Sequence, residues 1–440
     1  MNLKKITALS LTAVLALSTF ASCGSKAPST PASTPASTAS QSEAKPQEPV
    51  TLKLGNWDNA SDPHVDKVIE GFQALNPNIK IEMIDIPGTE YNQKLNIMLN
   101  GGSELDVFFV KDSSSTKAIF NKGQTVDLLP YATKDGVDLG QYTGLDKNFT
   151  FDGKLAGMPF RTDYYVLYYN KDIFDAAKLP YPTNDMTWKE FEATAKKLTK
   201  GEGATKTYGA LLHTWQACVM NWAIQDGKHT MMETDLSFFK PYYEMALRMQ
   251  NDDKSIMDYA TMKTGNIHYS SPFLTGNVGM MPMGSWFIAT MASKVKAGES
   301  KVNWGVATLP HGDDVPAGSV VGATTPLCIN PTSKNKDAAW EFVKYATSLE
   351  GAKTIAGVGK IPAIANPETL GIVAGLDGMP EGLLEAMKYT SIVLDRPVTD
   401  KVDEVNKMLG EQHGLIMLGE NDIDKGLAEM GKLSKEIQSN

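Results

Sequence analysis

The chain has 440 residues, of which 42% are hydrophobic, enough to build the cores of two or three domains. Acidic residues outnumber basic ones by 51 to 42, which gives a formal net charge of −9. This balance argues against binding to nucleic acid and against attachment to a membrane through a basic patch.

The first 22 residues are typical of a bacterial lipoprotein signal peptide. Two lysines precede an apolar run over residues 6–20, which is too short to span a membrane. Phe20-Ala21-Ser22-Cys23 resembles a lipobox, so we expect Cys23 to become the acylated first residue of the mature chain. A plain secretory signal that happens to end beside a cysteine is the alternative.

Residues 23–48 are predicted to be a disordered tether. After Cys23 the sequence is rich in Ser, Pro, Ala and Thr and has almost no large apolar side chain, so it cannot form a core. We expect an extended spacer that holds the rest of the protein on the outer face of the cell membrane, anchored by the lipid at Cys23. This arrangement favours a Gram-positive type of bacterium.

The next part of the chain alternates strands and helices. Strands are predicted over residues 51–54, 79–83 and 106–110, and helices with one apolar face over residues 65–75 and 90–100. This β-α-β-α-β order predicts a mostly parallel sheet with helices on both faces.

The ends of the first and third strands are candidate binding positions, because ligands of such sheets bind beyond the carboxyl ends of the strands. Trp57 and Asp58 follow the first predicted strand, and Asp112 follows the third. Asp112 could instead cap the helix that comes after it.

A second, more helical unit follows. An aromatic strand at residues 164–170 begins it, and helices are predicted over residues 188–198 and 237–250. Two further apolar strands, at residues 279–283 and 323–330, each lead into a helix. We interpret both as crossovers between two lobes.

Four segments carry a family resemblance when they are taken together and in this order. They are the lipobox with its tether, DGKLAGMP at 152–159 with YNKDIF at 169–174, FLTGNVGMMPMGSW at 273–286, and NPTSKNKDAAWEF at 330–342. With them the mature chain resembles the extracellular solute-binding proteins of ABC importers, in the sugar-binding group related to maltose-binding protein.

The resemblance implies an α/β fold of the periplasmic-binding-protein type II, in which two doubly wound lobes are joined by about three crossover strands. We expect the crossovers near residues 160–163, 281–284 and 329–333. The expected N-terminal lobe is then 49–160 with 284–329, and the expected C-terminal lobe is 161–283 with 330–440. A ligand held in the cleft between the lobes would favour their closure and would be delivered to a membrane permease. We expect a monomer.

Aromatic rings are predicted to contact the faces of a bound sugar, whose C–H groups pack well on flat rings. The candidates lie in or beside segments expected to border the cleft: Trp57, Trp215, Trp222 and Trp286. The remaining tryptophans, Trp188, Trp304 and Trp340, are expected in the core.

Charged side chains near strand ends are predicted to bind the sugar hydroxyls, because one carboxylate or guanidinium can engage two hydroxyls at once. These candidates are Asp58, Asp112, Arg161 and Asp163, and the neighbouring Tyr164 and Ser285 complete the predicted site. A solvated ion pair at a hinge is the alternative for Arg161 and Asp163.

The sequence contains none of the common catalytic, metal-binding or nucleotide-binding motifs, so we expect a receptor that has no cofactor, no metal and no enzymatic activity. The same fold could instead bind a polyamine, a metal chelate or an anion. A glycan-active enzyme would need two carboxylates about 5–10 Å apart. Cys218 and Cys328 are expected to be separate buried thiols, with a disulfide as the alternative.

Overall fold

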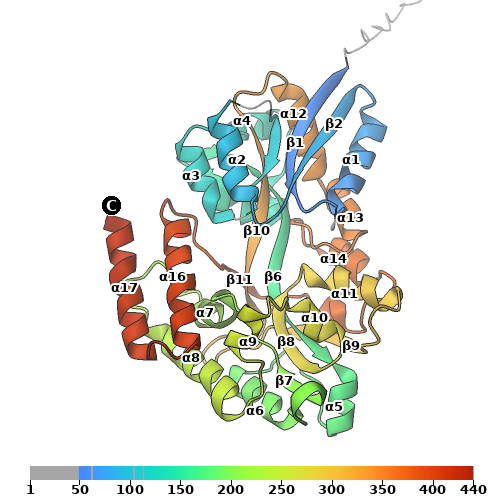
Figure 1. The fold of residues 1–440 in the computed structure, drawn as a ribbon. Coiled ribbons are helices and arrows are strands. Elements are labelled where there is room, and N and C mark those ends of the chain that lie inside the picture. The colour runs from blue at the N-terminus through green and yellow to red at the C-terminus, as the bar shows by residue number, and fades with distance from the viewer. Residues whose placement is uncertain (1–48, 61–62, 103–104, 112, 440) are drawn as a thin grey trace, which may run out of the picture. The chain divides into compact units, whose positions relative to one another are not determined.

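The computed structural model describes residues 49–60, 63–102, 105–111 and 113–439. The predicted lipidation site Cys23, the tether and Asp112 lie outside the described residues. No helix in the described part of the chain is both long and apolar enough to cross a membrane. The described residues form one compact unit with two lobes, an N-terminal lobe at the top of Figure 1 and a C-terminal lobe at the bottom.

The N-terminal lobe is built on three parallel strands. β1 (Val50–Trp57) lies between β2 (Ile79–Ile86) and β3 (Val107–Phe109). α1 (His64–Leu75) and α2 (Tyr91–Asn100) connect the strands. The predicted β-α-β-α-β order is therefore confirmed, and each strand or helix lies within a few residues of its predicted position.

Further elements complete this lobe, most of them short. In chain order they are η1 (Ser113–Ser115), α3 (Thr116–Asn121), α4 (Leu129–Lys134), η2 (Leu139–Tyr142), η3 (Leu145–Phe149), the hairpin of β4 (Thr150–Phe151) and β5 (Lys154–Leu155), and then α12 (Lys336–Ala346) and α13 (Leu349–Ala356) from much later in the chain.

Two long strands run from one lobe into the other (Figure 1). β6 (Met158–Asn170) pairs with β10 (Ser319–Ile329) along its first half and with β8 (Val278–Gly284) and β9 (Trp304–Thr308) along its second half, all antiparallel. β10 reaches β3 at its far end and pairs in parallel with β11 (Ser391–Leu394) at its near end. A third connection follows α13, where Pro362 forms a bridge with Arg161 of β6.

The C-terminal lobe holds the remaining elements, most of them helices. They are α5 (Lys171–Ala177), α6 (Trp188–Leu198), η4 (Gly203–Thr205), β7 (Tyr208–Ala210), α7 (Ala217–Ile224), η5 (Ser237–Phe239), α8 (Lys240–Leu247), η6 (Arg248–Asp252), α9 (Tyr259–Thr264), α10 (Ser270–Leu274), α11 (Phe287–Lys296), α14 (Pro367–Ala374), α15 (Leu383–Ala386), α16 (Val402–Met417) and α17 (Ile423–Ser439). The predicted helix over residues 188–198 matches α6, which begins with a capping box between Thr187 and Glu190.

The hydrophobic cores correct the expected division of the chain between the lobes. Residues 284–329 were assigned to the N-terminal lobe, but α11 and β9 pack in the C-terminal core. Residues 330–440 were assigned to the C-terminal lobe, but α12 and α13 pack with β1, α1 and β3 in the N-terminal core. The chain returns to the C-terminal core at α14 and stays there to α17.

The error arises at β8, which was predicted to be a crossover near residues 281–284. Among the described strands β8 pairs with β6 and β7 alone, and it stays within the C-terminal lobe. An apolar strand that leads into a helix has the same sequence pattern whether it changes lobe or not. The change of lobe also occurs within β10 rather than at residues 329–333, because β10 pairs with β11 at one end and with β3 at the other.

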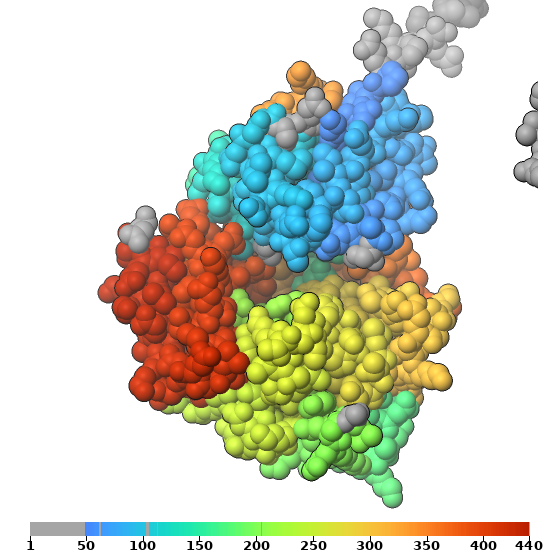
Figure 2. Space-filling view, viewed as in Figure 1, coloured from blue at the N-terminus to red at the C-terminus, as the bar shows by residue number. Residues whose placement is uncertain are grey.

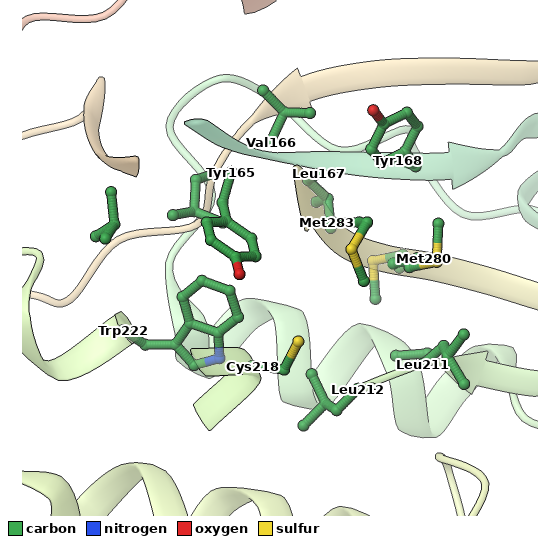
Figure 3. Close-up of a cluster of buried hydrophobic side chains, with 14 of the residues drawn as sticks. Tyr165, Val166, Leu167, Tyr168, Leu211, Leu212, Cys218, Trp222, Met280 and Met283 are labelled. Atoms are coloured by element: carbon green, nitrogen blue, oxygen red, sulfur yellow. The ribbon is translucent and has the colours of Figure 1, made fainter. Parts of the chain in front are cut away.

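Successive side chains of β6 lie on opposite faces of the sheet, so neighbouring tyrosines point in opposite directions. Figure 3 shows Tyr165 and Leu167 on one side of the strand and Val166 and Tyr168 on the other. The ring of Tyr165 points toward Trp222 of α7, at 5.4 Å between ring centroids. Trp222 is fully buried and stacks on Trp188 at 4.6 Å.

The two described cysteines are separate buried thiols, as expected. Cys218 lies in the C-terminal core beside Trp222 (Figure 3), and Cys328 lies in β10 against α2 and β3. The tryptophans expected in the core, Trp188, Trp304 and Trp340, are all buried.

Candidate ligand-binding cleft

A cavity of about 780 Å³ lies between the lobes, and residues of both lobes line it. Figure 2 shows the surface hollowed between the blue and cyan N-terminal lobe and the yellow and green part of the C-terminal lobe. The N-terminal lobe contributes Trp57, Asp58, Thr89 and Lys111, and the crossing strands contribute Arg161, Asp163, Tyr165, Ala323 and Thr325. We call this cavity the cleft.

Four aromatic residues of the C-terminal lobe form one wall of the cleft, and we call them the aromatic wall: Tyr165, Trp215, Tyr269 and Trp286. Neighbouring rings meet edge to face or tilted, with centroids 5.6 Å apart for Tyr165 and Trp286 and 5.7 Å apart for Trp215 and Tyr269. The indole Nε1 of Trp286 donates to the Tyr269 hydroxyl at 3.0 Å. These contacts fix the orientation of the wall before any ligand binds.

The local sequence explains the position of Trp286. Gly284 ends β8, and a methyl group there would overlap the indole ring. The absence of a side chain therefore lets the indole fold back over the strand end and face the cleft. Trp215, by contrast, lies on the loop before α7 and is 40% exposed, which leaves much of its ring accessible to a ligand.

Trp57 faces the cleft from the opposite lobe, at the end of β1. Its ring packs against Tyr91 at 5.2 Å, and the guanidinium of Arg161 lies 5.5 Å from its centre. Arg161 is buried, and its Nε lies 3.5 Å from Asp163. The cleft therefore has an aromatic side chain on each lobe with an ion pair between them.

Ser285 holds Asp163 in position through a hydrogen bond. Its hydroxyl donates to Asp163 at 3.2 Å and accepts from the backbone N–H of Tyr164 at 3.2 Å. Asp163, which lines the cleft, is thus held by Ser285 and by Arg161.

Asp58 and Lys111 stabilise the loop after β2. Asp58 accepts from the backbone N–H of Gly88 at 2.7 Å, and the Lys111 ammonium donates to the carbonyl of the same residue at 2.5 Å. Both side chains also line the cleft, so the loop and the cleft rim are built from the same contacts.

A segment between β11 and α16 adds a second ion pair to the cleft. Asp395 and Arg396 line the cavity, and the two charged groups lie 3.5 Å apart. Just beyond them, Asp400 accepts from Asn121 at 2.7 Å, and Asp403 in the first turn of α16 accepts from Ser115 at 2.8 Å, so this segment and the start of α16 contact the N-terminal lobe.

Histidines near the aromatic wall are neutral at neutral pH. Burial lowers the pKa of His213 from 6.5 to about 4, and burial also lowers the pKa of His268, which lines the cleft. Burial raises the pKa of Tyr269 to about 12, so its hydroxyl stays protonated. Among the described residues, no group of three or more His, Cys, Asp and Glu side chains is placed to hold a metal ion.

A known protein family matches most of the length of this chain. Residues 58–353 match the family described as bacterial extracellular solute-binding proteins. This range includes both crossing strands and most of the cleft. The chain belongs to the bacterial extracellular solute-binding protein family.

Solved structures of other solute-binding proteins share the fold. A sugar transporter of Rhizobium etli, in an open conformation, is 41% identical and superposes with a TM-score of 0.79 over 88% of this chain and 99% of that one. An ABC substrate-binding protein of Listeria monocytogenes in complex with cycloalternan is 22% identical, with a TM-score of 0.76 over 89% of this chain and 100% of that one.

One relative is named a lipoprotein. An uncharacterized lipoprotein of Streptomyces antibioticus is 24% identical over 317 residues, which is 68% of this chain and 66% of that one.

The structure brings six of the predicted site residues of this solute-binding protein together around the cleft: Trp57, Asp58, Arg161, Asp163, Trp215 and Trp286. Three others are corrected. Tyr164 is buried with its hydroxyl bonded to the Met387 carbonyl, because alternation along β6 turns Tyr165 to the cleft instead. Trp222 is a core residue, and Ser285 acts through Asp163.

Sequence reasoning missed the residues supplied by α7, by the loop around Tyr269 and by the segment of Asp395 and Arg396. The sequence analysis predicted no helix over α7, and nothing in the sequence pattern of this buried segment indicates which of its faces borders the cleft. Asp395 and Arg396 follow a short edge strand, β11, that the sequence analysis did not predict.

Proposed function

We propose that this protein is the carbohydrate receptor of an ABC importer, which captures a neutral sugar or oligosaccharide between its lobes and delivers it to a membrane permease without changing it. The observation that carries the proposal is the aromatic wall facing Trp57 across a cleft of about 780 Å³. Rings on both sides of the cleft suit the two C–H faces of a sugar ring.

The charges around the cleft favour a neutral ligand. The described lining residues include three carboxylates, Asp58, Asp163 and Asp395, and three basic groups, Lys111, Arg161 and Arg396. Two carboxylates pair with the adjacent arginines at 3.5 Å, and Asp58 and Lys111 meet at Gly88. A polyamine or an anion would leave one set of charges without a counterpart, whereas sugar hydroxyls can bond to both sets.

The relatives support the same class of ligand. The Rhizobium etli protein, at 41% identity, is described as a sugar transporter, and the structure of the Listeria monocytogenes protein contains cycloalternan. The family consists of binding proteins, and the proposal extends this to a receptor with no catalytic turnover.

The signal sequence supports attachment to the outer face of the membrane. The lipobox at Cys23 and the tether after it fit a lipid anchor, and the Streptomyces antibioticus relative is named a lipoprotein. A tethered receptor stays near its permease in a cell without an outer membrane.

The test is a thermal-shift screen of the mature chain carrying Cys23→Ser, which prevents acylation. The panel contains maltotriose, mannotriose, cellotriose, glucose, spermidine, inorganic phosphate and glycerol 3-phosphate. A ligand at a hundred times its dissociation constant stabilises the protein by about 2.7 kcal/mol, which is an easily detected shift. We expect a shift with one class of sugar and no hydrolysis of that sugar on prolonged incubation.

Two outcomes would contradict the proposal. A response to spermidine or to a phosphate compound, with none to the sugars, would move the function to another solute. Release of shorter saccharides from the stabilising sugar would show that the cleft is an enzyme active site.

A further inference from the structure

Helix α7 turns one face to the floor of the cleft. The residues of α7 that line the cavity are Ala217, Met220, Asn221 and Ile224, which are spaced as i, i+3, i+4 and i+7. Three of them are apolar, so Asn221 is the one polar side chain that this face of α7 presents.

The side-chain amide of Asn221 is buried and has a nitrogen without a hydrogen-bond acceptor among the described residues. Its side chain is only 4% exposed, and its Nδ2 is enclosed without a hydrogen-bond partner among the described residues. A buried amide that loses water and gains no partner destabilises the folded protein, so native structures seldom keep one without a use for it.

Gln225 shows how the same region treats an amide with a structural role. It lies four residues after Asn221, at the end of α7, and is 1% exposed. Its Nε2 donates to the carbonyls of Pro310 at 3.0 Å and Ser319 at 2.6 Å, and its Oε1 accepts from the Trp188 indole at 3.2 Å. The fold therefore pairs both the Nε2 and the Oε1 of Gln225, whereas the Nδ2 of Asn221 is left enclosed and unpaired among the described residues.

We propose that Asn221 is a specificity-determining residue whose amide is completed by a hydroxyl group of the bound sugar. This inference rests on the proposed function. Ala217, Met220 and Ile224 contact the C–H surface of the same sugar unit, and Asn221 binds the hydroxyl that projects between them. A sugar without a hydroxyl at that position would leave the amide unpaired and would be rejected.

The experiment compares Asn221→Leu with Gln225→Leu in the mature chain carrying Cys23→Ser. The first measurement is the melting temperature without any sugar. Since the Nδ2 of Asn221 has no hydrogen-bond partner among the described residues, we expect Asn221→Leu to melt at the wild-type temperature or above it. Gln225→Leu removes three hydrogen bonds and should melt below the wild type.

The second measurement is calorimetric titration with maltotriose, mannotriose and cellotriose, each tested on the wild type and on both variants. For any of these that binds the wild type, we expect Asn221→Leu to weaken the affinity at least tenfold. Gln225→Leu, titrated well below its melting temperature, should keep the wild-type affinity because Gln225 does not line the cleft.

Either of two results would overturn the inference. A melting temperature of Asn221→Leu below that of the wild type would show that the amide supports the free fold, and an unchanged sugar affinity would show that it does not meet the ligand. If no sugar of the thermal-shift panel binds the wild type and spermidine or a phosphate compound does, the proposed function fails in its own right, and the melting temperature of Asn221→Leu still decides whether the amide supports the free fold.

Discussion

Replacing Trp286 by alanine tests whether the aromatic wall binds the ligand. The indole of Trp286 lies at the end of β8 with one side on Tyr165 and its Nε1 on the Tyr269 hydroxyl. It is half-buried in the free protein and lines the cleft. Truncation would remove a ring surface from the cleft and also release Tyr269.

The magnitude follows from two contributions. A sugar ring that covers roughly 40 Å² of the indole face would bury apolar area worth about 1 kcal/mol. A ring-face contact adds roughly 0.5–1.5 kcal/mol by analogy with aromatic pairs. The sum of about 1.5–2.5 kcal/mol corresponds to a dissociation constant roughly ten- to seventyfold higher.

The assay is calorimetric titration with the sugar that stabilises the wild type most in the thermal-shift panel. Trp286→Phe keeps a ring over Gly284 but loses the donor to Tyr269, so a smaller loss, about fivefold, is expected. Trp340→Ala is the matched control, because Trp340 is 3% exposed and lies in the N-terminal core away from the cleft. That variant should lose stability and keep its affinity.

One result would refute the reasoning about the wall. If folded Trp286→Ala binds the sugar as tightly as the wild type, the ring does not meet the ligand, whatever its position at the cleft. Equal losses in Trp286→Ala and Trp340→Ala would indicate that binding only follows stability.

Two further predictions concern buried titratable groups. Burial raises the pKa of Cys218 to about 12 and that of Cys328 higher still, so iodoacetamide at pH 8 should label neither thiol in the native Cys23→Ser chain and both in urea, as read by mass spectrometry; rapid native labelling would contradict the described burial. Burial lowers the pKa of His413 from 6.5 to about 3, so below pH 6.5 the unfolded chain takes up a proton that the folded chain refuses. Between pH 7 and pH 5 the free energy of unfolding, measured in urea, should therefore fall by about 2 kcal/mol because of this group. His413→Gln should remove that part of the pH dependence. If the free energy of unfolding of the variant changes with pH as that of the wild type does, His413 is not the source.

Local sequence patterns were sufficient to predict the strands and helices but not the division of the chain between lobes. The first three strands and α1, α2 and α6 lie close to their predicted positions, because apolar periodicity and caps act over a few residues. The destination of a strand depends on its partners. β8 reads as an apolar strand before a helix, and only its pairing with β6 and β7 shows that it stays in one lobe.

The same distinction between local sequence and tertiary structure separates the site residues that were predicted correctly from those that were not. Arg161 and Asp163 were expected just before a strand, and they line the cleft from within β6. Trp57 and Asp58 follow from the rule that ligands bind beyond the carboxyl ends of strands, and both line the cleft. Tyr164 and Tyr165 cannot be told apart by that rule, because a shift of one residue in β6 moves a side chain to the other face. Ser285 was chosen as a ligand contact, but its bonds to Asp163 and Tyr164 make it a support.

Asn221 illustrates what kind of site residue a single sequence conceals. An asparagine on an otherwise apolar helix has the same pattern as Gln225 one turn later, and both read as core-facing amides. The difference is whether neighbouring elements supply partners: Pro310, Ser319 and Trp188 do so for Gln225. No such partner meets the Nδ2 of Asn221 within the part of the chain that the structure describes. An unpaired polar group at a cavity wall is therefore a property of tertiary structure, and it is the basis for proposing a ligand contact at a position that periodicity alone would assign to the core.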